Sequence, residues 1–146
     1  MIDRKWIGHE LPASELTLDR TRLRFFAKAI GETDPVYTEL AAAREAGHPD
    51  LPAPPTFLFA AELDSGAIDT LLAQLEIPLA QVLHGEQSFT YHRVACAGDT
   101  VTVRSRIEDI YDKKGGALEF LVKTSHATNQ RGERVAEFRS VLIYRH

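Results

Sequence analysis

Two stretches of the sequence carry side chains that could transfer protons. In one of them, His84 and Glu86 lie two residues apart, so both project from the same face of a regular β-strand. An imidazole beside a carboxylate can act as an acid–base pair, because the carboxylate tunes the pKa of the ring. The alternative is a polar surface pair or part of a dimer face. Gly85 between them permits a β-bulge, which would turn the upstream residues to the opposite face.

The other stretch runs from Gly31 to Ala43 and reads GETDPVYTELAAA. It supplies the carboxylates of Glu32 and Asp34 and the phenol of Tyr37. A phenol has an ordinary pKa of about 10, so we expect Tyr37 to be a poor base at neutral pH. The alternative for all three residues is structural. Asp34 precedes a proline and suits a turn, Glu32 is solvated, and the Tyr37 ring fills space.

Composition narrows the class of protein. A chain of 146 residues predicts a single domain, 1–146, with a substantial core. The net charge of −4 argues against a nucleic-acid partner, and the lack of a long apolar run argues against a membrane span. The N-terminus has no apolar core of a signal peptide. The single cysteine, Cys96, suits a reducing compartment, so we expect a cytoplasmic protein. The six histidines show no ligand spacing, so we expect no metal.

Helical spacing dominates the chain before residue 81. Residues 6–16 predict a short strand or extended arm, after which Thr17 or Asp19 caps a helix that ends at Gly31. A second helix is predicted over 36–45, and a short one over 65–79. Between these two, Pro55 and Thr56 open an apolar helix. We expect this helix to be central and to bury the following residues: Phe57, Leu58, Phe59 and Leu63.

From residue 81 the apolar period changes to two, which predicts the strands 81–94, 100–112, 117–129 and 134–146. Glycine-containing turns between them are typical of antiparallel hairpins. We therefore expect an α+β hot-dog fold, in which a curved antiparallel meander wraps round the central helix. Gln87, Phe89 and Tyr91 should point toward that helix. The free edge of the meander favours dimerisation by edge pairing.

Four segments, in the order RFFAKAIGETDPVY, APPTF, VLHGEQSF and CAGDTV, resemble the MaoC-like family of (R)-specific hydratases and dehydratases. The resemblance covers nearly the whole chain. It is closest to the N-terminal-type, non-catalytic domains, which include a subunit of heterodimeric (3R)-hydroxyacyl-ACP dehydratases. Catalytic members carry the motif G-D-x-N-P-L-H-x5-A. Gly31, Pro35 and Ala43 match it, whereas Glu32, Asp34 and Tyr37 replace its Asp, Asn and His.

In catalytic relatives the motif Asp and His hold a water and transfer a proton to the α-carbon of a trans-2-enoyl thioester. The resemblance therefore implies a degenerate catalytic motif at Glu32, Asp34 and Tyr37. It also implies a homodimer, or a heterodimer with a catalytic hot-dog subunit, and an acyl thioester of CoA or a carrier protein as substrate, with no cofactor. The expected substrate-binding residues are Pro55, Thr56, Phe57, Gly85 and Gln87. Basic residues that could meet the phosphates, or simply be solvated, are Arg93, Arg104, Arg106, Lys113 and Lys114.

Three functions follow from these observations. The leading hypothesis is a subunit of an (R)-specific enoyl-CoA hydratase or 3-hydroxyacyl dehydratase, which needs a catalytic partner. The second is a freestanding hydratase or thioesterase that uses Glu32, or His84 with Glu86. The third is a non-catalytic module that binds an acyl thioester without reacting it.

Overall fold

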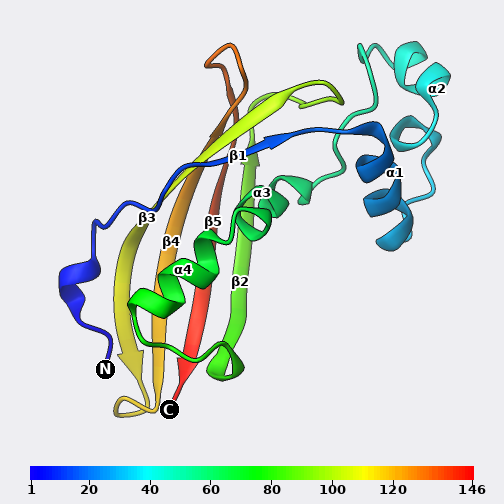
Figure 1. Ribbon diagram of the computed structural model, residues 1–146. Coiled ribbons are helices and arrows are strands. Elements are labelled where there is room, and N and C mark those ends of the chain that lie inside the picture. The colour runs from blue at the N-terminus through cyan, green and yellow to red at the C-terminus, as the bar shows by residue number, and fades with distance from the viewer.

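Five β-strands form one antiparallel sheet that curls around two short helices (Figure 1). The structure is a computed structural model that describes residues 1–146. The strands are β1 (Ser14–Thr17), β2 (Val82–Tyr91), β3 (Thr100–Lys113), β4 (Leu118–Thr128) and β5 (Arg134–Arg145). Their order across the sheet is β1-β3-β4-β5-β2. The predicted α+β hot-dog fold is confirmed.

Alternation of apolar and polar residues explains the central strands. In β3, Val103 and Ile107 are buried, whereas Arg104 and Arg106 between them are exposed. The hairpin from β3 to β4 turns at residues 114–116, all of which have positive φ. Glycine adopts this backbone without steric cost and fills two of the three positions. The predicted strand boundaries here agree with the structure to within about two residues.

The strand β2 does not pair with β3, so the predicted four-stranded meander is wrong at this point. Instead, β2 crosses to the far edge of the sheet and pairs along its length with β5. The connection, residues 92–99, is longer than a usual hairpin loop of roughly two to five residues. Its backbone bonds elsewhere: the N–H of His92 donates to the carbonyl of Val135 at 2.9 Å, and that of Ala97 to Leu51 at 2.8 Å. The glycine turn at residues 97–99 therefore precedes β3 but does not join β2 and β3 into a hairpin.

The central helix is present but divided. A 3-10 turn (Phe57–Phe59) leads into α3 (Ala60–Asp64), and α4 (Ala67–Gln74) follows after Gly66, whose φ is 68°. Both helices lie across the concave face of the sheet (Figure 1). The left-handed glycine changes the direction of the chain between them, which a continuous helix would not permit.

Burial along this segment departs from the prediction at one position. Phe57 and Leu58 are buried as predicted, and Phe59 is half-buried. Leu63 is 56% exposed, so its predicted place in the core is wrong. The residues of α3 that face the sheet are Ala61 and Glu62. Leu63 comes one position later in so short a helix and therefore points away from the sheet.

Two further helices lie beside the sheet (Figure 1). The first, α1 (Arg20–Ala29), begins at Asp19, whose carboxylate accepts hydrogen bonds from the two backbone N–H groups that follow the first helical residue. The predicted helix 36–45 is shorter, because a 3-10 turn (Pro35–Tyr37) precedes α2 (Leu40–Glu45). At this break, the Thr38 carbonyl accepts a hydrogen bond from the Arg24 side chain. We call α1, this turn and α2 the side unit.

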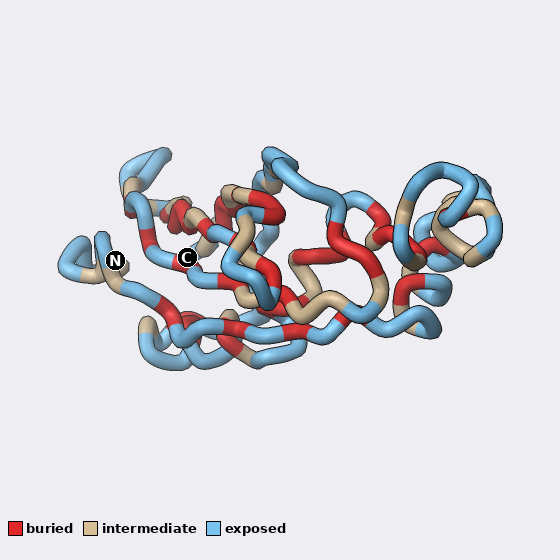
Figure 2. Tube along the Cα trace, turned by 90° about the horizontal axis from the view of Figure 1, so that it is seen from above, coloured by how far each residue is buried: buried red, intermediate tan, exposed pale blue.

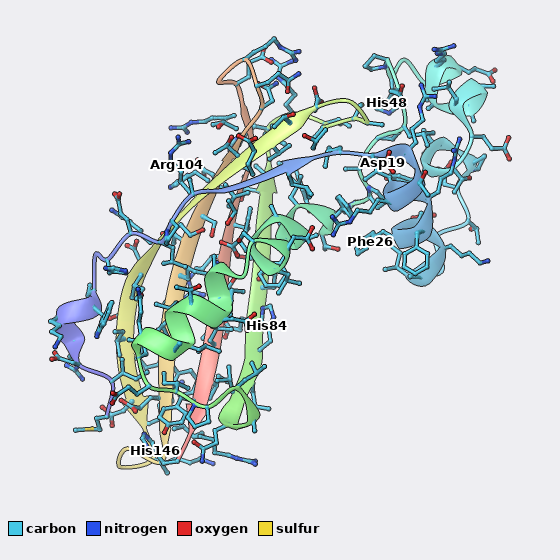
Figure 3. The ribbon with its side chains drawn as sticks, in the orientation of Figure 1. Asp19, Phe26, His48, His84, Arg104 and His146 are labelled. Atoms are coloured by element: carbon cyan, nitrogen blue, oxygen red, sulfur yellow. The ribbon has the colours of Figure 1, made fainter.

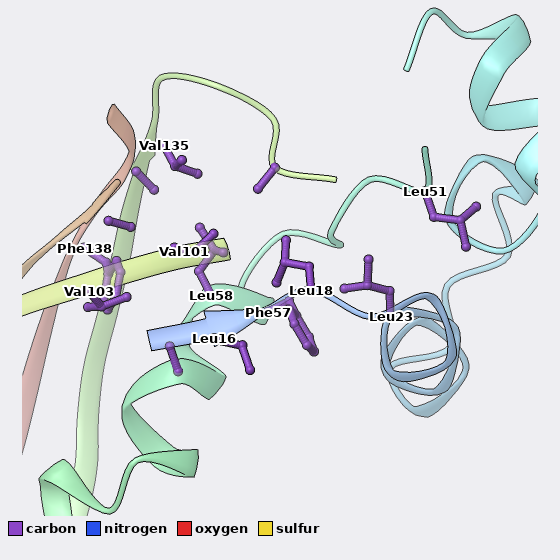
Figure 4. Packing of buried hydrophobic residues seen from close by; sticks show 14 of the residues in the cluster. Leu16, Leu18, Leu23, Leu51, Phe57, Leu58, Val101, Val103, Val135 and Phe138 are labelled. Atoms are coloured by element: carbon purple, nitrogen blue, oxygen red, sulfur yellow. The ribbon is translucent and has the colours of Figure 1, made fainter. Parts of the chain in front are cut away.

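A large apolar cluster joins the side unit to the sheet (Figure 4). Leu23 of α1 and Leu51 meet Leu18 and Phe57 there. Phe26 packs edge-to-face on Phe57, with ring centroids 5.1 Å apart, which is a favourable geometry for aromatic rings. Seen from above, buried segments continue from the sheet into this junction (Figure 2). The side unit is therefore fixed to the sheet by core packing.

A second apolar cluster lies between α4 and the lower part of the sheet. Its members are Leu11, Ala67, Leu71, Ile107, Ile110, Leu121 and Leu142. None of the helices has the length and apolar character needed to cross a membrane. Along β3 and β4, the buried Ser105 and Lys123 lie between residues of the two clusters and contact Glu62 of α3.

Candidate functional site

An apolar cavity of about 160 Å³ lies where the side unit meets the sheet. Residues 36–37 and 52–55, the end of β2 and the connection at 93–95 form most of its wall. Eight of its thirteen lining residues are hydrophobic. A cavity of about 150 Å³ with an aliphatic and aromatic lining can hold a benzene ring. This one therefore has room for a small apolar group.

Tyr37 lies in the wall of this cavity, on the 3-10 turn of the side unit. Burial raises the pKa of its phenol, and the negative charges of Glu32, Asp34 and Tyr91 add smaller increments in the same direction. The phenol is therefore protonated at neutral pH. In that state it donates a hydrogen bond but cannot accept a proton as a general base.

The two carboxylates of the same stretch are engaged in the local turn. One oxygen of Glu32 accepts hydrogen bonds from the backbone N–H groups of Thr33 and Asp34, at 2.8 and 2.9 Å. Asp34 accepts one from the N–H of Val36 at 3.0 Å and caps the 3-10 turn. Neither carboxylate lines the cavity. The structural alternative thus describes Asp34 well, while Glu32 has the additional role of holding the turn.

The segment Pro55–Phe57 contributes to the site unequally. Pro55 lines the cavity, whereas Phe57 is buried in the large apolar cluster. Thr56 has a φ of 77°, in the left-handed region where a side chain is strained. Its backbone N–H donates to the hydroxyl of Tyr91 on β2 at 2.9 Å. The bond fixes the tyrosine ring at the cavity wall.

Of the five basic candidates, only Arg93 lines the cavity. Its side chain is 53% exposed and pairs with Glu133 at 3.2 Å. Arg104 and Arg106 line a separate hollow with His126, and Figure 3 shows Arg104 well apart from His48 of the cavity wall. The other two, Lys113 and Lys114, belong to the β3–β4 hairpin at the far end of the sheet. A phosphate at the cavity mouth would meet Arg93 alone among them.

The structure separates His84 from Glu86 by a bulge at Gly85. The register places His84 opposite Leu142 and Glu86 opposite Val141, so the two side chains lie on opposite faces of the sheet. Glu86 pairs with an exposed arginine, Arg139, at 3.3 Å. The two predicted acid–base partners are therefore not brought together. A Cβ at Gly85 would lie 2.6 Å from the Ile143 side chain, so any larger residue would have to displace that side chain.

The inward face of β2 agrees with the prediction. Gln87 is half-buried and accepts a hydrogen bond from the Ser140 hydroxyl at 2.6 Å. Phe89 packs on Phe138, with ring centroids 5.3 Å apart, and Tyr91 stacks on Phe89. His84 lies on the same strand, nearer to its start (Figure 3). The edge strand thus carries a row of polar and aromatic groups toward the central helices.

Sequence reasoning missed a buried ion pair beneath α3. The ammonium of Lys123 lies 2.5 Å from both carboxylate oxygens of Glu62, and both side chains are buried. Ser105 and Ser125 also donate to the Glu62 carboxylate. Burial lowers the pKa of Lys123, and the negative charge of Glu62 opposes that shift. The signal was present, because Lys123 alternates in phase with Leu121 and Ser125 on the buried face of β4.

The structure offers neither a cluster of metal ligands nor a reactive thiol. No three His, Cys, Asp or Glu side chains lie close enough together to hold a metal ion. The thiol of Cys96 is buried, and burial raises its pKa away from the reactive thiolate. The expectation that no cofactor is needed stays a prediction.

Comparison with known proteins agrees with this fold. The family model described as FAS1-like, dehydratase domain region, matches residues 5–138. A UPF0336 protein from Streptomyces coelicolor is 34% identical over 145 residues, which is 99% of this chain and 95% of that protein. This level of identity over the full length extends beyond a shared architecture to a shared family.

Two solved structures resemble the chain in fold. One is a C-terminally truncated HadBC (3R-hydroxyacyl-ACP dehydratase) complex from Mycobacterium tuberculosis, with a TM-score of 0.81, 24% identity, and coverage of 94% of this chain and 96% of that chain. The other is a MaoC-like dehydratase, with a TM-score of 0.81, 21% identity, and coverage of 95% of this chain and 42% of that chain. The family model and the full-length relative show that the chain belongs to the FAS1-like dehydratase-domain family, and the two solved structures show that it shares the fold of a MaoC-like dehydratase.

Proposed function

We propose that this protein is an acyl-thioester-binding subunit of an (R)-specific enoyl-CoA hydratase or 3-hydroxyacyl dehydratase, and that a hot-dog partner supplies the catalytic groups. The observation that carries the proposal is the apolar cavity at the motif segment, with the protonated phenol of Tyr37 in its wall. The cavity offers space for an acyl group, but the residue at the position of the motif His is a phenol that stays protonated at neutral pH.

Support for a partner comes from the edge of the sheet. β2 is an edge strand, so the outer side of its backbone finds no strand partner within the chain. Near it, the apolar side chains of Leu83 and Leu63 are more than half exposed. A second hot-dog domain that extends the sheet at β2 would cover both features. The HadBC structure, which shares this fold, is itself a complex.

The test is hydration of a short enoyl thioester. The purified chain alone should hydrate crotonyl-CoA at close to the background rate. Co-expression with a hot-dog protein that carries an intact G-D-x-N-P-L-H motif should yield a complex that is active. The matched control is the same complex with the motif His of the partner changed to Ala. Robust turnover by the chain alone, surviving both Tyr37→Phe and Glu32→Ala, would contradict the proposal.

A non-catalytic binding module is the second candidate. It is favoured by the engagement of Glu32 and Asp34, the carboxylates at the motif positions, in backbone hydrogen bonds of the local turn. This candidate predicts that the chain binds acyl-CoA and that no hot-dog partner raises the hydration rate. Binding without any partner-dependent activity would therefore select it over the subunit proposal.

A further inference from the structure

One buried hydrogen-bond donor on the concave face of β2 has no acceptor. It is Nε2 of Gln87, the only buried side-chain nitrogen or oxygen in the protein without a hydrogen-bond partner. The oxygen of the same amide accepts from the Ser140 hydroxyl at 2.6 Å and from Nε2 of His84 at 3.1 Å. These two bonds hold the amide plane, so the unpaired NH2 group has a fixed direction.

The other buried polar side chains show how completely this protein satisfies such groups. The carboxylate of Glu62 is held by Lys123 and by two serine hydroxyls. The buried carboxylate of Glu119 accepts from the backbone N–H of Ile2 and from the ring of His146. An unpaired donor is rare in native proteins and expensive to keep. Its presence in so well satisfied an interior indicates an acceptor that arrives with a ligand.

The surroundings of Gln87 select a neutral acceptor. The nearest ammonium, that of Lys123, lies one strand further in, and both oxygens of Glu62 already neutralise it. The ring of His84 uses its Nε2 on the same amide. A carboxylate or phosphate would therefore find no free positive charge here. A neutral carbonyl oxygen, which an amide N–H binds well, fits the site.

The buried donor lies on an edge strand, next to the exposed side chain of His84. β2 is an edge strand, and the half-buried Phe59 ring lies 5.3 Å from the exposed ring of His84. Further along β2, Tyr91 lines the apolar cavity. At about 3.3 Å per residue, Gln87 and Tyr91 lie roughly 13 Å apart. An extended acyl thioester with its pantetheine arm can span that distance.

We propose that Gln87 binds a neutral carbonyl oxygen of the acyl-pantetheine thioester through Nε2. The acceptor is the thioester carbonyl or an amide carbonyl of the pantetheine arm, and CoA and carrier protein present both. This assignment rests on the proposed function, because it requires that the chain bind an acyl thioester. Ser140 and His84 act as positioning residues, since they hold the amide oxygen and thereby orient the nitrogen.

The test compares two ligands that differ only at the thioester carbonyl: hexanoyl-CoA and the thioether S-hexyl-CoA. Their dissociation constants are measured by calorimetry for the wild type, Gln87→Leu and Gln87→Glu. Gln87→Glu keeps the acceptor for Ser140 while replacing the donor with an oxygen, so it carries the test if Gln87→Leu folds poorly. The control is Gln74→Leu, the same change at an exposed position of α4.

Both Gln87 variants should bind hexanoyl-CoA about tenfold more weakly, and the control should bind it like the wild type. If the variants lose affinity for hexanoyl-CoA alone, the acceptor is the thioester carbonyl. If they lose it equally for S-hexyl-CoA, the acceptor is in the pantetheine arm.

Unchanged affinity in both variants would overturn the inference and leave the proposed function standing. A change in subunit association without a change in ligand affinity would also overturn it, because the amide would then belong to a subunit interface. Failure of the wild type and control to bind either ligand would overturn the inference and the proposed function together.

Discussion

Tyr37 occupies the position that matches the His of the hydratase motif, and its phenol is protonated at neutral pH. Its raised pKa follows from burial and from the neighbouring negative charges, so no modest change of pH converts the phenol into a phenolate. The Glu32 carboxylate has a structural role, because one of its oxygens accepts hydrogen bonds from two backbone N–H groups of the turn. Both the residue types at these two positions and their contacts therefore argue against a general base in this segment.

The paired change Tyr37→His and Glu32→Asp should bring measurable hydration of crotonyl-CoA by the chain alone. Either single change should do much less, because residues of a catalytic unit act non-additively. An Asp side chain can still accept from the N–H two residues on, as Asp34 does from Val36, so we expect the free energy of unfolding to fall by less than about 1 kcal/mol. Thioester absorbance and urea unfolding measure the two effects. Equal activity in Tyr37→His and the double variant would exclude Glu32 from the reacting unit.

The roles of single residues were partly predictable. Asp34 before a proline predicted a turn, and the strand period predicted that Gln87 faces inward. The separation of His84 and Glu86 depends on the bulge at Gly85, which the sequence permits without requiring. A side chain at this position would meet Ile143 of β5, and this contact joins distant parts of the chain.

The short helix α3 brings a carboxylate into the interior, and β4 supplies its counter-ion. Lys123→Met should lower the free energy of unfolding by about 3–5 kcal/mol, because Glu62 would be left as a buried charge without its partner. The double variant Glu62→Leu/Lys123→Met should recover most of that loss, since two apolar side chains can replace a buried pair at little cost. Urea unfolding of the two single variants and the double variant gives the coupling energy. A double variant as unstable as the sum of the single changes would contradict this account.

An ion pair ties α1 to the chain just before the cavity wall. Asp50 accepts from the Arg20 guanidinium and from the N–H of Leu51, and the guanidinium, its largest influence, lowers the pKa of Asp50 from 3.8 to about 2. The folded pKa lies below the unfolded value. The ionised carboxylate therefore stabilises the fold above pH 3.8, and this contribution disappears as the pH falls to about 2.

Asp50→Asn should remove the part of the pH dependence of the unfolding free energy that comes from this carboxylate. Because the pair is partly exposed, we expect the effect to stay below about 1 kcal/mol. Unfolding by urea at a series of pH values between 2 and 5 measures it, with Asp69→Asn on an exposed turn of α4 as the control. Parallel loss of stability in the wild type and Asp50→Asn across this window would show that the pair contributes nothing.

Helices and strands that are set by a local sequence pattern were predictable from the sequence. Pairings between residues far apart in the sequence were not. Period-two alternation located β3, β4 and β5, and Asp19 and Gly31 marked the ends of α1. The place of β2 beside β5 is accompanied by hydrogen bonds from the N–H groups of His92 and Arg93 to the Val135 carbonyl, which no local pattern contains. The same holds for Glu62, whose burial in an apolar helix is explained only by Lys123 on a distant strand.

The molecule as a whole leaves one long strand edge uncovered. We expect the chain to form dimers at roughly tens of micromolar when no other hot-dog protein is present. Leu83→Lys should weaken this association at least about tenfold, because a charge on an edge strand opposes pairing. Leu79→Lys is the matched control, since Leu79 is exposed by 64% against 51% for Leu83 but precedes the strand. Light scattering that finds a strictly monomeric wild type, or an equal effect of the two changes, would contradict edge pairing.

The path of β2 to the far edge of the sheet has a consequence during synthesis. Its only partner strand within the chain, β5, is made after β3 and β4. At about 5–20 residues per second, a nascent chain exposes β2 for a time on the order of seconds before β5 leaves the ribosome. During that delay β3 and β4 can already close their hairpin, while β2 remains open on both sides. A strand from a second chain made nearby can therefore reach β2 before β5 does.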